Sequence, residues 1–102
     1  MRPVGLLDLD AVARCLCAAT VQQQYDLARE IVGRADVADR YRKRLGRRHA
    51  VYGDGTLSAA TAPYATVRGR VVEQTYLAAL RIVVDVLIER RGFCFSERRS
   101  IW

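Results

Sequence analysis

Six cationic side chains lie within nine positions near the middle of the chain, where residues 40–48 read RYRKRLGRR. Five of the six are arginines and one is a lysine. The planar guanidinium group matches the oxygens of a phosphate or a carboxylate, and it keeps its charge when it is partly buried. The type and spacing of these residues therefore predict a surface for phosphates or for an acidic partner.

The composition of the whole chain points the same way. Of its 102 residues, 17 are Lys or Arg and 11 are Asp or Glu, which gives a net charge of +6. Such a balance favours nucleic acid or an acidic protein as the partner. The chain is 51% hydrophobic, which suits one globular domain, and no apolar run approaches the roughly 20 residues that cross a bilayer. A cytoplasmic location with no membrane partner is therefore expected.

A long helix is expected to position the cationic run. The apolar spacing predicts a helix from Val21 to about Leu45, where Gly46 supplies a stop. Winding the segment at 100° per residue places its apolar side chains on one arc and most of its cations on the other side. Arg42 projects into the apolar arc instead, which indicates packing or a contact between subunits, near Asp39, rather than phosphate binding.

Five cations remain as candidate nucleic-acid ligands, because they lie on the outer side of this helix or just after it. These are Arg40, Lys43, Arg44, Arg47 and Arg48. If each subunit engaged about five phosphates of double-stranded DNA, log affinity would fall with log salt at a slope near −4 to −5. Such binding would be weak and independent of DNA sequence. The alternative is a solvated helix end that contacts nothing.

The loop after the cations contains Gly53-Asp54-Gly55, which predicts a turn. It is no Walker loop, because no Gly-Lys-Ser/Thr follows it. Thr56 can then cap a short helical turn near residues 56–62.

Two further helices complete the predicted fold. Apolar spacing predicts one over residues 8–19, with Asp8 as its N-cap, and one over residues 70–91, with Gly92 as its stop. The fold class is therefore all-α, a hairpin or bundle of about three main helices with the short turn at 56–62.

The last predicted helix is apolar over about two-thirds of its circumference, so it should be buried on more than one side. Two other main helices offer too little protein to cover it, and we expect the chain to self-associate, as in a ring. A central helix in a compact monomer is the alternative. The expected oligomer interface consists of Val72, Tyr76, Leu80, Val83, Leu87 and Arg42.

Large apolar side chains return after Gly92. This divides the chain into residues 1–92, an oligomerisation and DNA-binding domain, and residues 93–102, a C-terminal tail. The tail either folds back onto the core or anchors in a partner, with its aromatic residues as hot spots. The candidate partner-binding residues are Phe93, Phe95, Ile101 and Trp102.

Catalytic chemistry is not expected. His49 is the only histidine, and the three cysteines form no CxxC pair, so the sequence predicts neither a nucleophile–base pair nor a zinc site. No cofactor or metal is implied. These features favour a binding or assembly protein and not an enzyme.

The stretch ADRYRKRLGRRHAVYGDGTL, at residues 38–57, resembles the small terminase subunits of alphaproteobacterial gene transfer agents, which are phage-like particles. The opening Met-Arg-Pro and the first predicted helix fit as well. An aromatic residue, often Trp, precedes the Gly-Asp-Gly in that family, and here it is Tyr52. The resemblance is clear over about twenty residues and general elsewhere.

The resemblance implies a function in DNA packaging. Proteins of that family are helical, assemble as rings, bind DNA, and recruit or regulate the large terminase subunit, an ATPase and nuclease. This chain is too short to add a DNA-reading helix-turn-helix to an oligomerisation core, which suits a particle that packages host DNA without sequence preference.

Two other functions fit the residues. A small basic transcriptional regulator would use residues 20–45 in a helix-turn-helix and the last helix for dimerisation. A protein adaptor would pair its arginines with an acidic partner and bind no DNA.

Overall fold

A computed structural model describes the backbone of residues 1–100 and the side chains of residues 1–90. Helix α1 spans Leu6–Cys17, α2 spans Val21–Leu45, α3 spans Leu57–Ala60 and α4 spans Glu73–Ser100. This confirms the predicted all-α fold. The bounds of α2 match the prediction, and Gly46 adopts the left-handed conformation, with φ 70°, that ends a helix.

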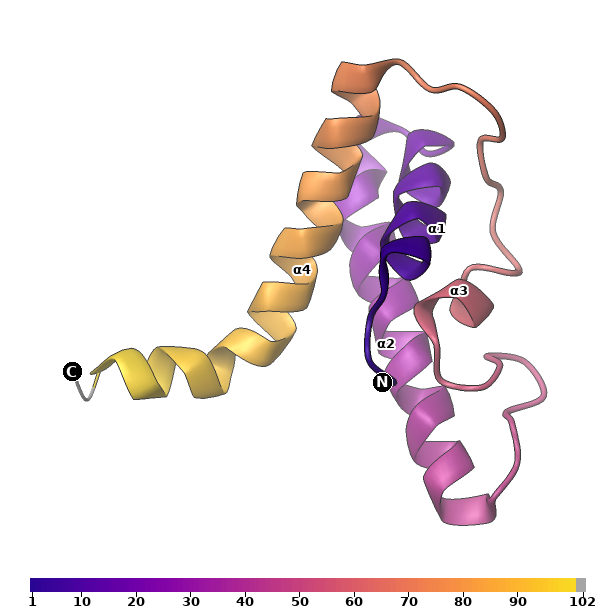
Figure 1. The fold of residues 1–102 in the computed structure, drawn as a ribbon, viewed down its shortest axis with the longest axis vertical. Coiled ribbons are helices and arrows are strands. Elements are labelled where there is room, and N and C mark those ends of the chain that lie inside the picture. Colours follow the sequence, from indigo (N-terminus) through magenta and orange to yellow (C-terminus); the bar gives the residue numbers. More distant parts are fainter. Residues whose placement is uncertain (101–102) are drawn as a thin grey trace.

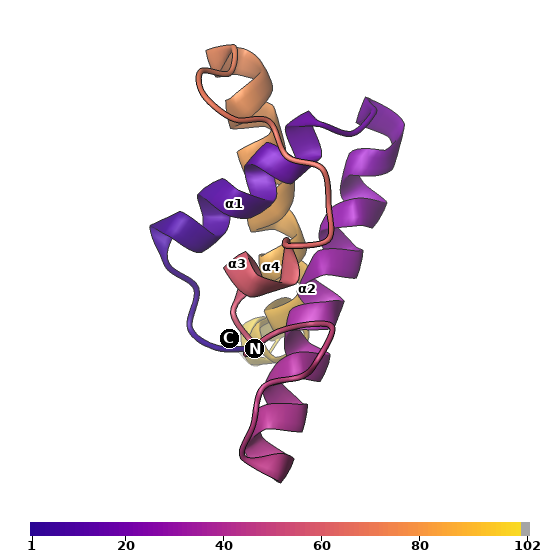
Figure 2. The same cartoon turned by 90° about the vertical axis from the view of Figure 1, so that its right-hand side faces the viewer.

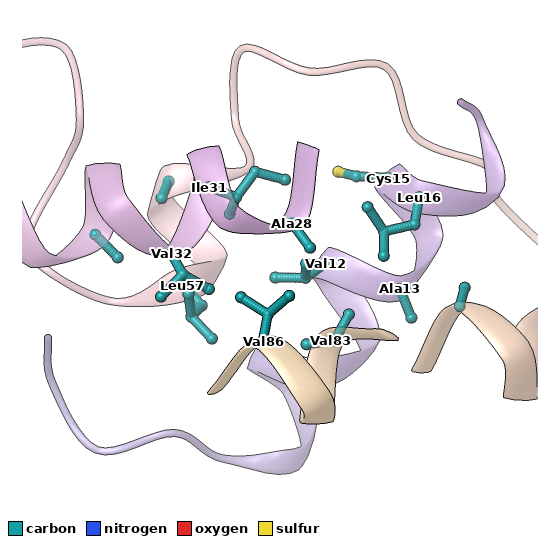
Figure 3. Packing of buried hydrophobic residues seen from close by; sticks show 13 residues of the cluster. Val12, Ala13, Cys15, Leu16, Ala28, Ile31, Val32, Leu57, Val83 and Val86 are labelled. Atoms are coloured by element: carbon teal, nitrogen blue, oxygen red, sulfur yellow. The ribbon is translucent and has the colours of Figure 1, made fainter. Parts of the chain in front are cut away.

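The three long helices surround one core (Figures 1 and 2). Helices α1 and α4 both pack against the first part of α2, and the single turn of α3 closes the core from a third side. The last turns of α2 extend beyond the other helices (Figure 1). Figure 3 shows the core side chains, among them Val12 and Leu16 of α1, Ile31 of α2, and Val83 of α4.

The first helix begins earlier than the sequence predicts, because Asp8 is not its N-cap. Gly5 holds that position, and Asp8 lies in the first turn, where its Oδ2 accepts a hydrogen bond from the Gly5 N–H at 3.0 Å. The other oxygen of Asp8 accepts from the hydroxyl of Ser58 at 2.7 Å. Asp8 therefore provides an acceptor for a backbone N–H at the start of α1 and connects this end of the helix to α3.

The last helix also differs from the prediction at both ends. It begins at Glu73, three residues later than expected, and it continues to Ser100, so Gly92 does not stop it. A glycine in a helix interior costs about 1 kcal/mol relative to alanine, which weakens a helix without ending it. Figure 1 shows the last part of α4 bending away from the other helices.

Gly33, in the middle of α2, gives a stability prediction. A Cβ added there meets no side chain or other segment within 4 Å, so Gly33→Ala should gain helix propensity without a clash. We expect about 1 kcal/mol of added stability in urea unfolding.

Gly55→Ala is the matched contrast. Its φ is +95°, and an added Cβ would lie 2.8 Å from the Cβ of Asp39. This variant should lose at least about 2 kcal/mol. The interpretation is wrong if the two substitutions change the free energy of unfolding in the same direction.

Candidate nucleic-acid interface

Four arginines at the end of α2 and in the loop after it form an exposed surface. Within the part of the chain whose side chains are described, none of them forms an ion pair. We call this set the arginine surface: Arg40, Arg44, Arg47 and Arg48. It lies on the protruding end of α2 and the turn beyond it (Figure 1), so a large flat partner can reach it.

Lys43, the fifth candidate ligand, is placed differently. Its Nζ lies 3.2 Å from Asp39 Oδ2. The same carboxylate accepts from Arg42 Nη2 at 2.9 Å, which agrees with the sequence prediction that Arg42 lies near Asp39. Two of the six cations in the run therefore face an internal anion, and a phosphate would have to compete with Asp39 for them.

Asp39 is buried, with 1% of its surface exposed, and it is held by three cations. The α-ammonium group of Met1 lies 3.0 Å from its Oδ2, and Arg42 and Lys43 supply the other two contacts. The hydrogen bond from Met1, followed by those from Arg42 and Lys43, lowers the pKa of Asp39 far below its ordinary value of 3.8, although burial acts in the opposite direction. The carboxylate is thus charged throughout the neutral range.

Asp36 connects the cluster of charges around Asp39 (Met1, Arg42 and Lys43) to α4. Its Oδ1 lies 2.7 Å from the Met1 ammonium, and its other oxygen accepts from Arg90. Burial alone would raise the pKa of Asp36, but the hydrogen bonds from Met1 and Arg90 outweigh it and lower the pKa below 3.8. Opposite charges therefore connect the start of the chain, α2 and α4 in one place.

The predicted Gly-Asp-Gly turn is confirmed, and it packs directly on the cluster. Gly55 lies so close to Asp39 that no side chain fits between them, and its carbonyl accepts from the Arg2 N–H at 3.0 Å. Asp54 Oδ1 accepts from the hydroxyl and the N–H of Thr56. Thr56 in turn caps α3 by accepting from Ala59 N, as the sequence predicted. The turn is structural and positions the loop against α2.

A stack of rings that the sequence analysis did not identify also holds this loop. The ring of His49 lies parallel to that of Tyr52, 4.6 Å between centroids, and meets Tyr41 edge-on at 4.9 Å. The guanidinium of Arg34 lies over the ring of Tyr52 at 5.1 Å and over that of Tyr64 at 5.2 Å. We call these five residues the aromatic stack. The sequence contains one sign of this stack, because Arg34 and Tyr41 are seven positions apart and therefore share a helix face.

Helix α4 exposes a row of apolar side chains at the spacing of one helix face. The exposed fractions are 52% for Leu77, 37% for Val84 and 59% for Ile88. These three residues form the α4 stripe, and Arg81 lies between them with its side chain 84% exposed. Leu80 and Leu87 flank the stripe, half-buried against the core.

Two residues of the predicted oligomer interface contact the chain's own core instead of facing outward. Val83 is fully buried in the core of the chain itself, and the hydroxyl of Tyr76 donates to Asp10 Oδ1 at 2.6 Å. Both therefore serve the internal packing of α4. Val72 is 69% exposed and remains available to a partner. The sequence placed all of these residues on one wide arc, but only the structure shows which half of the arc the core covers.

Other predicted features lie elsewhere or are not found. Phe93, Phe95, Ile101 and Trp102 lie outside the residues whose side chains the structure describes. Among the described residues, no helix is long and apolar enough to span a membrane. In the same residues, no three or more His, Cys, Asp or Glu side chains are placed to hold a metal ion.

These observations define an all-α domain with an exposed arginine surface at one helix end and an exposed apolar stripe on its last helix. The chain belongs to the family described as a domain of unknown function, DUF7742, whose family model matches residues 2–87. The match includes the whole arginine surface. Comparison with curated proteins and with solved structures gave no match.

Proposed function

We propose that this chain is a small terminase subunit of a phage-like gene transfer agent, which self-associates and binds double-stranded DNA without sequence specificity. The arginine surface is the observation that carries the proposal. Four exposed guanidinium groups that pair with no anion among residues 1–90 are suited to phosphates, which supply the sequence-independent part of protein–DNA affinity.

Base reading by the same surface is not expected. The amide side chains that commonly read bases are Asn and Gln. The exposed Gln74 lies in the first turn of α4, and the exposed Gln22 and Gln23 lie at the opposite end of α2. At 1.5 Å per residue, about 27 Å of helix separates them from Arg40. Gln22 and Gln23 are therefore remote from the arginine surface, which argues against an operator reader that combines these amides with the arginines.

Self-association is supported by the α4 stripe. Fully burying an exposed Leu, Val or Ile side chain is worth roughly 1.5–3 kcal/mol, and the three stripe residues are 37–59% exposed, so covering them gains about half of that for each. Exposed apolar groups on one helix face, here with Arg81 between them, are typical of an interface. A ring of subunits would cover the stripe and repeat the arginine surface around a closed band. Weak single contacts with phosphates then gain from multivalency. Recruitment of the large terminase subunit belongs to the proposal through the family resemblance in residues 38–57.

Light scattering behind a sizing column tests the assembly. The native chain should elute as one species of many subunits. Replacing Leu77, Val84 and Ile88 with Ser should reduce it to a folded monomer, because the exposed row no longer gains from burial. The matched control replaces Val21 and Val51, which are 78% and 64% exposed outside α4, with Ser and should leave the mass unchanged. A native monomer, or a stripe variant of native mass, would refute the assembly.

A further inference from the structure

We propose that the aromatic stack is a positioning device for DNA binding: His49, held against Tyr41 and Tyr52, fixes Arg47 and Arg48 beside Arg40 and Arg44 before any phosphate arrives. The inference rests on the proposed DNA-binding function and extends it. It assigns a role to Arg34 and to four ring-bearing residues, all of which lie outside the arginine surface.

The route of the chain after α2 makes this possible. At Gly46 the backbone turns back, with its N–H donating to the Arg42 carbonyl at 2.8 Å. The ring of His49 then meets Tyr41, about one helical turn before the end of α2, and Tyr52 meets Arg34 about 10 Å further back. Figure 2 shows this loop running back along α2. Arg47 and Arg48 thus lie between Gly46, which is bonded to the end of α2, and His49, whose ring contacts Tyr41.

His49 is fixed through its backbone and through its ring. Its N–H donates to the Gly53 carbonyl at 2.8 Å, and its carbonyl accepts from Gly53 N at 3.2 Å. Nδ1 of the ring accepts from the N–H groups of Val51 and Tyr52, each at 3.0 Å. Residues 49–53 therefore form a closed turn that the ring itself completes.

The ring of Tyr52 already has two partners within the chain. Tyr52 is stacked on His49, and the guanidinium of Arg34 lies over the ring of Tyr52 and over that of Tyr64. In a single-strand binding site, by contrast, the ring is open for a base to stack upon. The stack therefore suits a structural mount for the loop and not a direct contact with nucleobases.

The loop needs contacts that hold it against α2, because the four arginines repel one another. Like charges held within a few residues of each other would drive a mobile loop away from the end of α2. Binding would then have to order the loop, at a cost in conformational entropy that subtracts from affinity. Contacts among the rings and the guanidinium of Arg34 offset this repulsion in the free protein.

The test is a set of DNA-binding titrations with one duplex at fixed salt, under conditions in which circular dichroism shows each variant to be folded. His49→Ala should weaken binding about tenfold, because the loop must be ordered on binding. His49→Asn keeps an acceptor near the position of Nδ1 and should recover part of this loss. In a chain that already carries Arg47→Ala and Arg48→Ala, adding His49→Ala should cost less than about twofold, because the mount has nothing left to position.

Tyr41→Ala provides the same test should His49→Ala fail to fold, since it removes a ring contact from a helix that remains intact. Unchanged affinity in the folded His49 or Tyr41 variant overturns the inference alone, provided that Arg47→Ala with Arg48→Ala weakens binding. An equal loss in the native and the double-arginine backgrounds also overturns it. A native chain that binds no duplex overturns the inference and the proposed function together.

Discussion

Replacing Arg40, Arg44, Arg47 and Arg48 together with Ala should reduce duplex affinity about a hundredfold or more at about 0.1 M salt, equally for unrelated sequences. The reason is the loss of four guanidinium groups that have no internal anion among the described residues and are free to displace counterions from DNA. Each phosphate contact contributes about −0.9 to the slope of log affinity against log salt. The affinity of the variant should therefore depend very little on salt. Fluorescence anisotropy at three salt concentrations measures both quantities.

Two controls separate this surface from general basicity. Replacing Arg29, Arg68, Arg70 and Arg81 with Ala removes four exposed arginines elsewhere, so both quadruple variants fall from a net charge of +6 to +2. This control should retain most of the affinity. Lys43→Ala alone should have a small effect, because Asp39 already holds the ammonium group. Equal losses in the two quadruple variants would show that net charge, and not this surface, binds DNA.

Asp39→Asn should destabilise the fold by about 3 kcal/mol at pH 7, the second large effect that we expect. The substitution preserves the shape of a side chain that is almost fully buried but removes the anion shared by Met1, Arg42 and Lys43. Among residues 1–90, the Met1 ammonium would then keep Asp36 as its one counterion. Urea unfolding followed by circular dichroism measures the difference in free energy.

The effect should depend on pH with a defined sign. Because folding lowers the pKa of Asp39 below 3.8, its charge stabilises the fold above that value, and this contribution is lost as the pH falls below about 4. The difference between native and variant should therefore be constant from pH 7 to about 5 and shrink below 4. Asp85→Asn is the control, since Asp85 is exposed and its contact with Arg81 is 3.9 Å long, so less than about 0.5 kcal/mol is expected. A difference that grows in acid would contradict the assignment.

The positions of the helices could largely be predicted from the sequence, because apolar spacing and stop signals are local. Helix α2 is the clearest case, since Gly46 both ends the apolar pattern and adopts the conformation that a helix end requires. Asp8 was misassigned because an acid in the first turn and an acid at the N-cap look alike in a sequence. The end of α4 was misassigned because a single glycine weakens a helix without necessarily ending it.

The candidate site could be predicted only in part. A run of arginines at a helix end is visible in a sequence, and cations there also complement the helix dipole. Lys43 pairs with Asp39, and the same Asp39 also contacts the Met1 ammonium and the loop at Gly55. Both of these are distant from Asp39 along the chain. The aromatic stack likewise depends on where the loop returns along α2. Long-range contacts of this kind require the fold itself, which the local pattern does not supply.

The most direct test of the central claim is the salt dependence of duplex binding by the native chain, measured with two unrelated sequences. We predict equal affinities for both and a slope near −3.6 for each engaged subunit, from four phosphate contacts at about −0.9 each. A slope near zero, or no binding at low salt, would contradict the claim and favour an adaptor that binds an acidic protein. A strong preference for one duplex would contradict it in favour of a sequence-reading regulator.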